Sequence, residues 1–240
     1  MGKNLTQQKR GKGSPTFRSP SFRYEGKATY ISLTNGAVNG TIKDIIHCSG
    51  HSSPLMQIKY ENGEETLLQA PEGVKVGSTI MSGEDVPIEN GNTLPLRGIP
   101  EGTSIYNIEA IPGDGGKFVR SSGAFARIVA KMKDKIVVLL PSKKEKSFNP
   151  DCRASIGIIS GAGRTEKPFL KAGFKYYAMK AKNKYWPIVC AASMNAVCHP
   201  YGGSASATKG RPSVTSRDAP PGRKVGKIAA RRTGRKKGKQ

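Results

Sequence analysis

Both ends of this 240-residue chain are strongly basic and contain few apolar side chains. Residues 1–27 hold seven Lys and Arg residues and a single acid, and residues 200–240 hold twelve and a single acid. Segments of this composition, punctuated by Gly, Pro and Ser, bury too little apolar surface to offset the loss of chain entropy on folding. We therefore expect two extended terminal segments, 1–29 and 195–240, that become ordered only against a partner.

The charge of the whole chain narrows the kind of partner. Forty Lys and Arg residues stand against 17 acidic residues, which gives a formal net charge of +23. Such a chain repels itself unless a polyanion neutralises it, so nucleic acid is the first candidate and an anionic membrane surface the second. Residues 28–99 are the exception, because eight acids outnumber four basic residues there. The sequence shows no run of about 18 apolar residues and no apolar signal-peptide core.

The middle of the chain has the pattern of short β-strands. Apolar stretches such as GTIKDII, LMQIKY and KIVVLLP are separated by Asn-Gly and similar turn pairs. This spacing is typical of small barrels, and a natural break falls at TLPLRGIPEG. The fold class that we predict is mainly β, with one barrel over 30–93 and a second domain over 94–194.

Local patterns make sharper predictions. Asn62-Gly63 lies between MQIKY and ETLLQ and predicts a hairpin with a type I′ turn, in which both central residues have positive φ. ATYISL (28–33) and FVRSSG (118–123) are interpreted as further strands. Residues 167–180 fit a short helix, although FKYYAMK fits a loop or a strand equally well.

The cysteine and histidine pattern favours neither a disulfide scaffold nor a zinc site. Four cysteines occur, at Cys48, Cys152, Cys190 and Cys198. No pair has the two-residue gap of a zinc knuckle, so reduced thiols are expected. Cys48 with His51, or Cys198 with His199, would each supply only two of the four ligands that structural zinc requires. We expect no metal site and no cofactor.

Enzymatic chemistry finds little support in the sequence. SGAGRT (160–165) resembles a fragment of a phosphate-binding loop, but it lacks the glycine spacing and the Lys-Ser/Thr ending. A loop whose Arg164 can meet a phosphate is the simpler interpretation. No paired carboxylates and no nucleophile–base arrangement stand out, so we expect no catalytic residue.

Several motifs together resemble one known family. They are IYNIEAIPGDGGKFVRSSGAFARIVA (105–130), DCRASIG (151–157), KAG (171–173) and MNAVCHPYGG (194–203). With LLQAPEGVKVGSTIMSG and GNTLPLRGIPEGT upstream, they resemble the universal large-subunit ribosomal protein L-two family, called L-eight in eukaryotes. The resemblance covers nearly all of 10–240, and the tail PGRKVGKIAARRTGRKKGK is similar to archaeal members.

This resemblance implies an oligonucleotide-binding (OB) barrel followed by an SH3-like barrel. It implies a non-enzymatic protein that binds large-subunit rRNA near the peptidyl transferase centre and supports subunit assembly, subunit association and translation. The implied partners are this rRNA, neighbouring ribosomal proteins and the small subunit at the subunit interface, with no membrane and no homo-oligomer. The implied location is cytoplasmic, in the ribosome, where magnesium would be held mainly through bound rRNA.

His199 is the residue that most invites a catalytic interpretation, because its family counterpart has been proposed to support peptidyl transfer. A general base needs a matched pKa and usually an orienting partner, and Cys198 stands where the family usually has an acid. Tyr201 and the loop HCSGHSS (47–53) also depart from the family pattern. We favour the alternative, in which His199-Pro200 and Gly202-Gly203 shape a loop whose backbone approaches RNA closely.

The mechanism that we expect is electrostatic. Lys and Arg replace the counterions condensed on RNA, and Arg adds planar contacts to phosphates and stacking on bases. A nucleic-acid-processing enzyme with a cleft between the barrels and a DNA-compacting protein are the alternatives. The predicted RNA-contacting residues are Arg10, Lys12, Arg18, Arg23, Lys117, Arg120, Arg127, Arg153, Arg164, Lys171, Asn195, His199, Gly202, Gly203, Lys209, Arg211, Arg231, Arg232 and Arg235.

Overall fold

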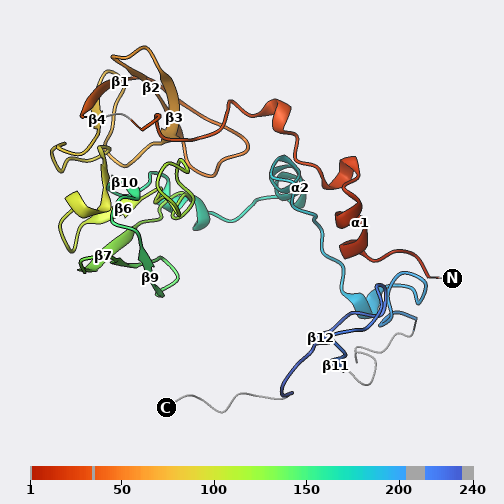
Figure 1. Cartoon of the computed structure of the whole chain (residues 1–240). Helices are drawn as coiled ribbons and strands as arrows, with labels where there is room; N and C mark the ends of the chain where they lie inside the picture. Colours follow the sequence, from red (N-terminus) through yellow and green to blue (C-terminus); the bar gives the residue numbers. More distant parts are fainter. Residues whose placement is uncertain (1, 34–35, 204–213, 234–240) are drawn as a thin grey trace. The chain divides into compact units, whose positions relative to one another are not determined.

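The computed structural model describes residues 2–33, 36–203 and 214–233 and divides the chain into two compact units (Figure 1). The central unit is Ser21–Leu170, and the terminal unit combines Met1–Pro20 with Lys171–Gln240. Within the described ranges, none of the helices has the length and apolar character needed to cross a lipid bilayer.

The central unit is mainly β and contains a ten-stranded sheet in the order β3-β2-β1-β4-β5-β10-β6-β7-β8-β9. β4 and β5 pair in parallel, and the other neighbours pair antiparallel. In Figure 1, β1 to β4 gather at one side of this unit and β6, β7, β9 and β10 at the other. The strands are β1 (Val38–Ile46), β2 (Leu55–Tyr60), β3 (Glu65–Gln69), β4 (Thr79–Ser82), β5 (Thr93–Pro95), β6 (Ser104–Tyr106), β7 (Ala126–Lys131), β8 (Ile136–Leu139), β9 (Glu145–Phe148) and β10 (Arg153–Ile156).

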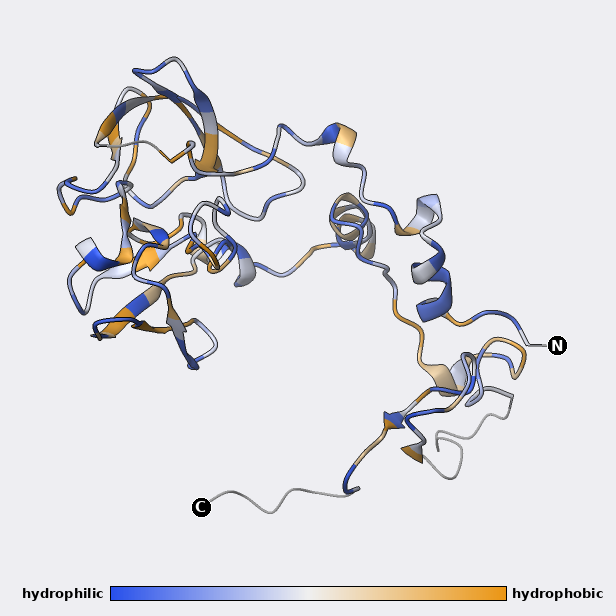
Figure 2. Ribbon diagram, in the orientation of Figure 1, coloured by the Kyte–Doolittle hydropathy of each residue, from blue (hydrophilic) through white to orange (hydrophobic). Residues whose placement is uncertain are grey.

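Two large hydrophobic clusters and a small third one around Leu55 stabilise this sheet. The first draws its buried members from residues 30–80, including Ile58 and Leu68, and the second from residues 86–156, including Ile105 and Ile128. The strands supply these side chains by alternation, because successive residues point to opposite faces. On β7, for example, buried Ala126 and Ile128 flank an exposed arginine. The apolar colouring in Figure 2 follows the same strands.

The hairpin predicted at Asn62-Gly63 is present, but its turn type differs from the prediction. β2 and β3 pair antiparallel across this turn, with Lys59 opposite Glu65. Gly63 has positive φ (86°), and its N–H donates to the carbonyl oxygen of Tyr60 at 3.0 Å. Asn62 does not have positive φ, so the prediction of a type I′ turn is wrong. A left-handed glycine that follows an ordinary turn closes a longer hairpin loop equally well.

Two stretches that were interpreted as strands form only isolated bridges. Within ATYISL, Ala28 bridges Leu67, and within FVRSSG, Phe118 bridges Ile108. Tyr30 and Ile31 of the first stretch are nevertheless buried, so their apolar pattern reflects burial rather than continuous pairing. A short apolar stretch in a sequence is produced by a paired strand and by a buried but unpaired segment alike.

The terminal unit has little apolar interior. Among its described residues, only Leu5 and Val225 are buried hydrophobic side chains. The prediction of extended ends is wrong for residues 6–12, which form helix α1 (Thr6–Lys12). This helix ends at Gly13, which has the left-handed conformation typical of helix C-termini. Its basic residues lie in the last turn, where positive charge interacts favourably with the helix dipole. The remaining elements are the 3-10 turns η1 (Pro15–Phe17) and η5 (Ala191–Ser193), helix α2 (Ala172–Ala181), and the short strands β11 (Val214–Thr215) and β12 (Lys227–Ile228).

Three more 3-10 turns lie in the central unit. The short helix predicted over 167–180 is present as α2, which begins at Ala172. The turns are η2 (Ser21–Arg23), η3 (Leu96–Gly98) and η4 (Ala162–Thr165). FKYYAMK is helical rather than loop or strand, since it lies wholly within α2. That helix has no buried residue, so its own unit buries little of its apolar surface.

Candidate nucleic-acid interface

Arg153 on β10 was predicted to contact RNA but is buried inside the central unit. Its Nη2 lies 2.8 Å from Oε1 of Glu109, whose side chain is fully buried. Its Nη1 donates to the carbonyl oxygen of Ile31 at 2.7 Å, and the guanidinium lies over the Tyr30 ring, 5.1 Å from its centroid. This burial argues against the RNA contact predicted for Arg153, because a guanidinium whose donors are used inside the protein offers little to RNA.

Glu109 is the centre of this buried network. Besides the ion pair, its carboxylate accepts the backbone N–H of Gly113 at 3.2 Å, of Gly115 at 3.1 Å and of Arg153 at 2.9 Å. A buried carboxylate is tolerated when a cation and several N–H donors satisfy it. The glycine-rich part of 105–130 is thus wrapped around an internal carboxylate.

Asp114 organises the same glycine-rich loop from within. Its oxygens accept the backbone N–H groups of Ala110 (3.0 Å), Ile111 (3.3 Å) and Gly116 (3.0 Å). Partial burial opposes ionisation, but these three hydrogen bonds prevail and lower the pKa of Asp114. The carboxylate is therefore charged at neutral pH and holds the loop in one shape.

Arg120 connects this loop to the segment before β1. Its Nη1 donates to the carbonyl oxygen of Gly116 at 2.9 Å, and its Nη2 donates to that of Ala28 at 2.7 Å. Burial lowers the pKa of the guanidinium, although arginine remains protonated at any physiological pH. Arg120 is half-buried, so its first role is to hold two segments of the central unit together.

The other predicted contacts are divided by exposure and by unit. His199 and Gly202 are half-buried. In the central unit, no contact among the described residues joins the exposed Lys117, Arg127 and Arg164 into one site. Three predicted residues, Lys209, Arg211 and Arg235, lie outside the described residues. The exposed ones are Arg10, Lys12, Arg18, Arg23, Lys117, Arg127, Arg164, Lys171, Asn195, Gly203, Arg231 and Arg232.

Arg164 lies on η4, within the SGAGRT stretch, and its Nε donates to Oγ of Ser122 at 2.9 Å. The whole of 161–170 is exposed. The stretch is an exposed 3-10 turn and not a strand-to-helix phosphate loop, as the missing Lys-Ser/Thr ending indicated.

Residues 194–203, the His199 loop, fold tightly on themselves. The N–H of Gly203 donates to the carbonyl oxygen of Met194 at 3.1 Å, and the N–H of Cys198 donates to that of Asn195 at 2.9 Å. A Cβ added to Gly202 would stand 2.3 Å from the oxygen of Met194 and 2.4 Å from that of Asn195. Glycine at 202 is therefore required by the close approach of the chain to its own backbone.

The His199 ring is oriented by the backbone of its own loop. Its Nδ1 accepts the N–H of Tyr201 at 3.1 Å, and the two rings lie 5.2 Å apart. Burial lowers the pKa of His199 from its usual value of 6.5, so the ring is neutral at pH 7, with the proton on Nε2. The ring is fixed in place, but by a backbone amide and not by a carboxylate.

We expect His199→Ala to leave peptidyl transfer in fully assembled particles within about threefold of normal, because a residue that only shapes a loop contributes far less than the 10²–10⁴-fold of a general base. The measurement is single-turnover peptide bond formation across pH 6 to 8. Particles carrying Tyr201→Ala, which loses the neighbouring ring but not the imidazole, serve as the control. A loss of a hundredfold with His199→Ala alone would restore the catalytic interpretation.

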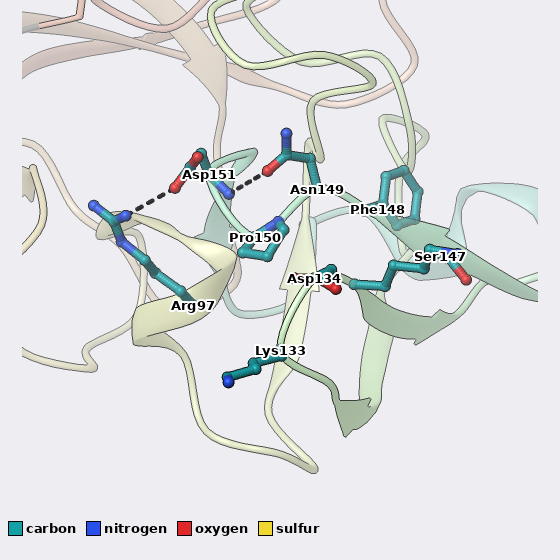
Figure 3. A pocket seen from close by; sticks show the side chains of 9 residues that line it. Arg97, Lys133, Asp134, Ser147, Phe148, Asn149, Pro150 and Asp151 are labelled. Atoms are coloured by element: carbon teal, nitrogen blue, oxygen red, sulfur yellow. Dashed lines mark hydrogen bonds and ion pairs between the residues drawn. The ribbon is translucent and has the colours of Figure 1, made fainter.

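The central unit has an open hollow of about 690 Å³ between the turn after β7 and the turn after β9 (Figure 3). Arg97 reaches into it and pairs with Asp151 at 2.8 Å and also with Glu84. Lysines and carboxylates share its wall, and neither His nor Cys is among its lining residues. The hollow therefore supports neither a nucleophile–base pair nor a soft-metal site.

The thiols of the described residues do not assemble a metal site. No group of three or more His, Cys, Asp and Glu side chains there is placed to hold a metal ion. Sγ of Cys48 lies 3.2 Å from Nδ1 of His51, which is a hydrogen-bonding contact. Burial raises the pKa of Cys152 to about 11, so this thiol stays protonated and behaves as a small apolar side chain.

Sequence reasoning missed the aromatic side chains of the terminal unit. Phe174 and Tyr177 on α2 are 56% and 69% exposed, and Tyr176 is 42% exposed. Lys175 lies between Phe174 and Tyr176, and Lys180 follows Tyr177 by three residues along the helix. The alternation of aromatic and basic residues in KAGFKYYAMKAKNKYW was the signal that could have found them, because aromatic rings next to cations suit nucleic acid.

Comparison with known proteins assigns these features to one family. Residues 89–219 match the family described as Ribosomal Proteins L2, C-terminal domain. Curated relatives with the name Large ribosomal subunit protein uL2 match nearly the whole chain. The protein of Methanothermobacter thermautotrophicus is 50% identical over 99% of this chain and 100% of its own length. That of Methanocella arvoryzae is 52% identical over 98% of this chain and 99% of its own.

Proposed function

Because this chain belongs to the large ribosomal subunit protein uL2 family, which is structural and not enzymatic, we propose that it binds large-subunit rRNA as a constituent of the large subunit. The observation that carries this proposal is the uneven division of charge between the two units. The terminal unit has 22 basic residues and one acid, whereas the central unit has 18 basic and 16 acidic residues. Almost the whole net charge therefore belongs to the part with the smallest core.

The terminal unit needs a polyanion to stabilise its fold. With Leu5 and Val225 as its buried hydrophobic residues among those described, the unit gains little from burial to oppose the repulsion of its own charges. Phosphates supply both the neutralisation and the surface against which such segments lie. Phosphate contacts position a protein without reading sequence, so selectivity would come from the shape of the folded rRNA.

The central unit supplies the rigid part. Its two larger hydrophobic clusters draw their buried members from residues 30–80 and 86–156, which supports our inference of an OB barrel followed by an SH3-like barrel. The buried Glu109–Arg153 pair and the loop around Asp114 support a fixed shape for the second of these. Arg23, Lys117, Arg127 and Arg164 are its exposed predicted contacts.

We further propose that the chain lies near the peptidyl transferase centre. There it would support subunit assembly, subunit association and translation. Neighbouring ribosomal proteins and the small subunit are the further partners, and no homo-oligomer or membrane contact is proposed. The tight His199 loop supports this placement, because it offers an exposed, shaped backbone at Asn195 and Gly203. Magnesium would be held mainly by the rRNA.

Sedimentation of a native extract through sucrose in magnesium buffer tests the proposal. We expect the chain to migrate with the large subunit and to be released only by high salt, because its contacts are largely electrostatic. Binding of the purified chain to folded large-subunit rRNA and to duplex DNA of equal length provides the comparison. A chain that stays at the top of the gradient, or that prefers the DNA, contradicts the proposal.

A further inference from the structure

A groove in the terminal unit lies between the N-terminal segment and α2. Its volume is about 340 Å³. Pro15 and Pro20 line one wall, and Tyr176 of α2 lines the other. This size is at the lower end of the range for small-molecule sites, which suits a group as large as one nucleotide.

The walls of the groove are held together by specific contacts. Asn183, just after α2, donates from Nδ2 to the carbonyl oxygen of Phe17. The rings of Phe17 and Tyr185 lie 5.9 Å apart at their centroids. Lys175 places its ammonium 5.3 Å from the centroid of the Trp186 ring. The segment around Phe17 and the chain that follows α2 thus form one built surface.

The chemistry of the lining is aromatic and cationic. Three rings, Tyr176, Tyr185 and Trp186, share the groove with three cations. No Asp or Glu lines it among the residues that the structure describes. The three cations are Arg18, Lys180 and Lys184.

We propose that this groove binds a single unpaired nucleotide of RNA. Its base would stack on the aromatic rings, and its phosphates would meet Arg18, Lys180 and Lys184. Aromatic rings bind any base through its π-face, while cations track the backbone. An acidic peptide would satisfy the cations but would leave the aromatic rings without a matching partner. The inference rests on the proposed binding of rRNA and adds to it the kind of nucleotide that the terminal unit takes.

Trp186 makes the proposal testable, because it is the only tryptophan of the 240 residues. The full chain is titrated with a single-stranded ten-nucleotide oligoadenylate while tryptophan fluorescence is recorded. We expect saturable quenching, because a base stacked in the groove changes the surroundings of the indole. An abasic ribose-phosphate oligomer of the same length and charge should bind through phosphates yet leave the fluorescence nearly unchanged.

Matched variants separate the groove from the rest of the surface. Tyr185→Ala should weaken oligoadenylate binding about tenfold, and Tyr185→Phe should restore it because the ring is kept. Phe169→Ala is the control, because it also removes an exposed aromatic ring (52% exposed), but Phe169 lies in the central unit and does not line the groove. We expect it to change the affinity less than twofold.

The outcomes distinguish this inference from the proposed function. Equal quenching by the abasic oligomer, or by polyglutamate instead of oligoadenylate, overturns the groove proposal. Binding of fluorescently labelled oligoadenylate with no change at Trp186 also overturns it but leaves RNA binding intact. Absence of any RNA binding would instead contradict the proposed function itself.

Discussion

Glu109→Ala should lower the free energy of unfolding by about 3–5 kcal/mol, because it leaves the buried Arg153 without its counter-charge. The side chain of Glu109 is fully buried and that of Arg153 is 10% exposed, so water does not replace the lost partner. The N–H groups of Gly113 and Gly115 lose their acceptor as well. Urea unfolding of the full chain, followed by far-ultraviolet circular dichroism, measures the change.

A surface ion pair in the same unit provides the control for this prediction. Arg97 pairs with Glu84 and Asp151, and all three side chains are at least half exposed. Arg97→Ala should therefore cost less than about 1 kcal/mol. Glu109→Gln keeps the shape and removes only the charge, so we expect an intermediate loss. If Glu109→Ala proved no more damaging than Arg97→Ala, the buried pair would not be what holds the glycine-rich loop.

The affinity of the full chain for large-subunit rRNA should fall about a thousandfold or more when salt rises from about 50 to 200 mM, as expected for six or more phosphate contacts. The terminal unit, with 22 basic residues and one acid, supplies most of these contacts. Filter binding across a series of KCl concentrations gives the slope of log affinity against log salt.

Two triple variants locate the contacts. Changing Arg10, Lys12 and Arg231 to Gln should reduce the slope by about three, roughly one for each lost phosphate contact. All three are exposed in the terminal unit. Changing Lys43, Lys59 and Lys75 to Gln removes the same charge from the central unit and should leave the slope unchanged. Equal effects of the two triples would mean that binding follows net charge alone.

Much of the strand arrangement could be predicted because the sequence carries it locally. The stretches LMQIKY and KIVVLLP correspond to β2 and β8, since alternating burial leaves a period of two. The helix at FKYYAMK could not be separated from a loop or strand, because α2 buries no residue and thus leaves no apolar period. Likewise, ATYISL is buried without being paired along its length, which no local pattern reveals.

The candidate site was less predictable, because the sequence does not show whether a charged side chain is buried or exposed in the fold. Arg153 and Arg164 look alike there, yet one is 8% exposed beside Glu109 and the other lies in an exposed turn. The partner that buries Arg153 stands 44 positions away along the chain. The groove beside Tyr176 also depends on a distant segment, since its other wall comes from residues near Pro15.

The joining of the two chain ends in one unit sets an order of events during biosynthesis. Ser21–Leu170 is continuous, so it can fold as soon as it has emerged. Met1–Pro20 is made first, but its companion segment begins only at Lys171. At about 5–20 residues per second, the 150 residues of the central unit take roughly 8 to 30 seconds to make, and Met1–Pro20 waits that long for Lys171. During that interval any nearby polyanion competes for this cationic segment.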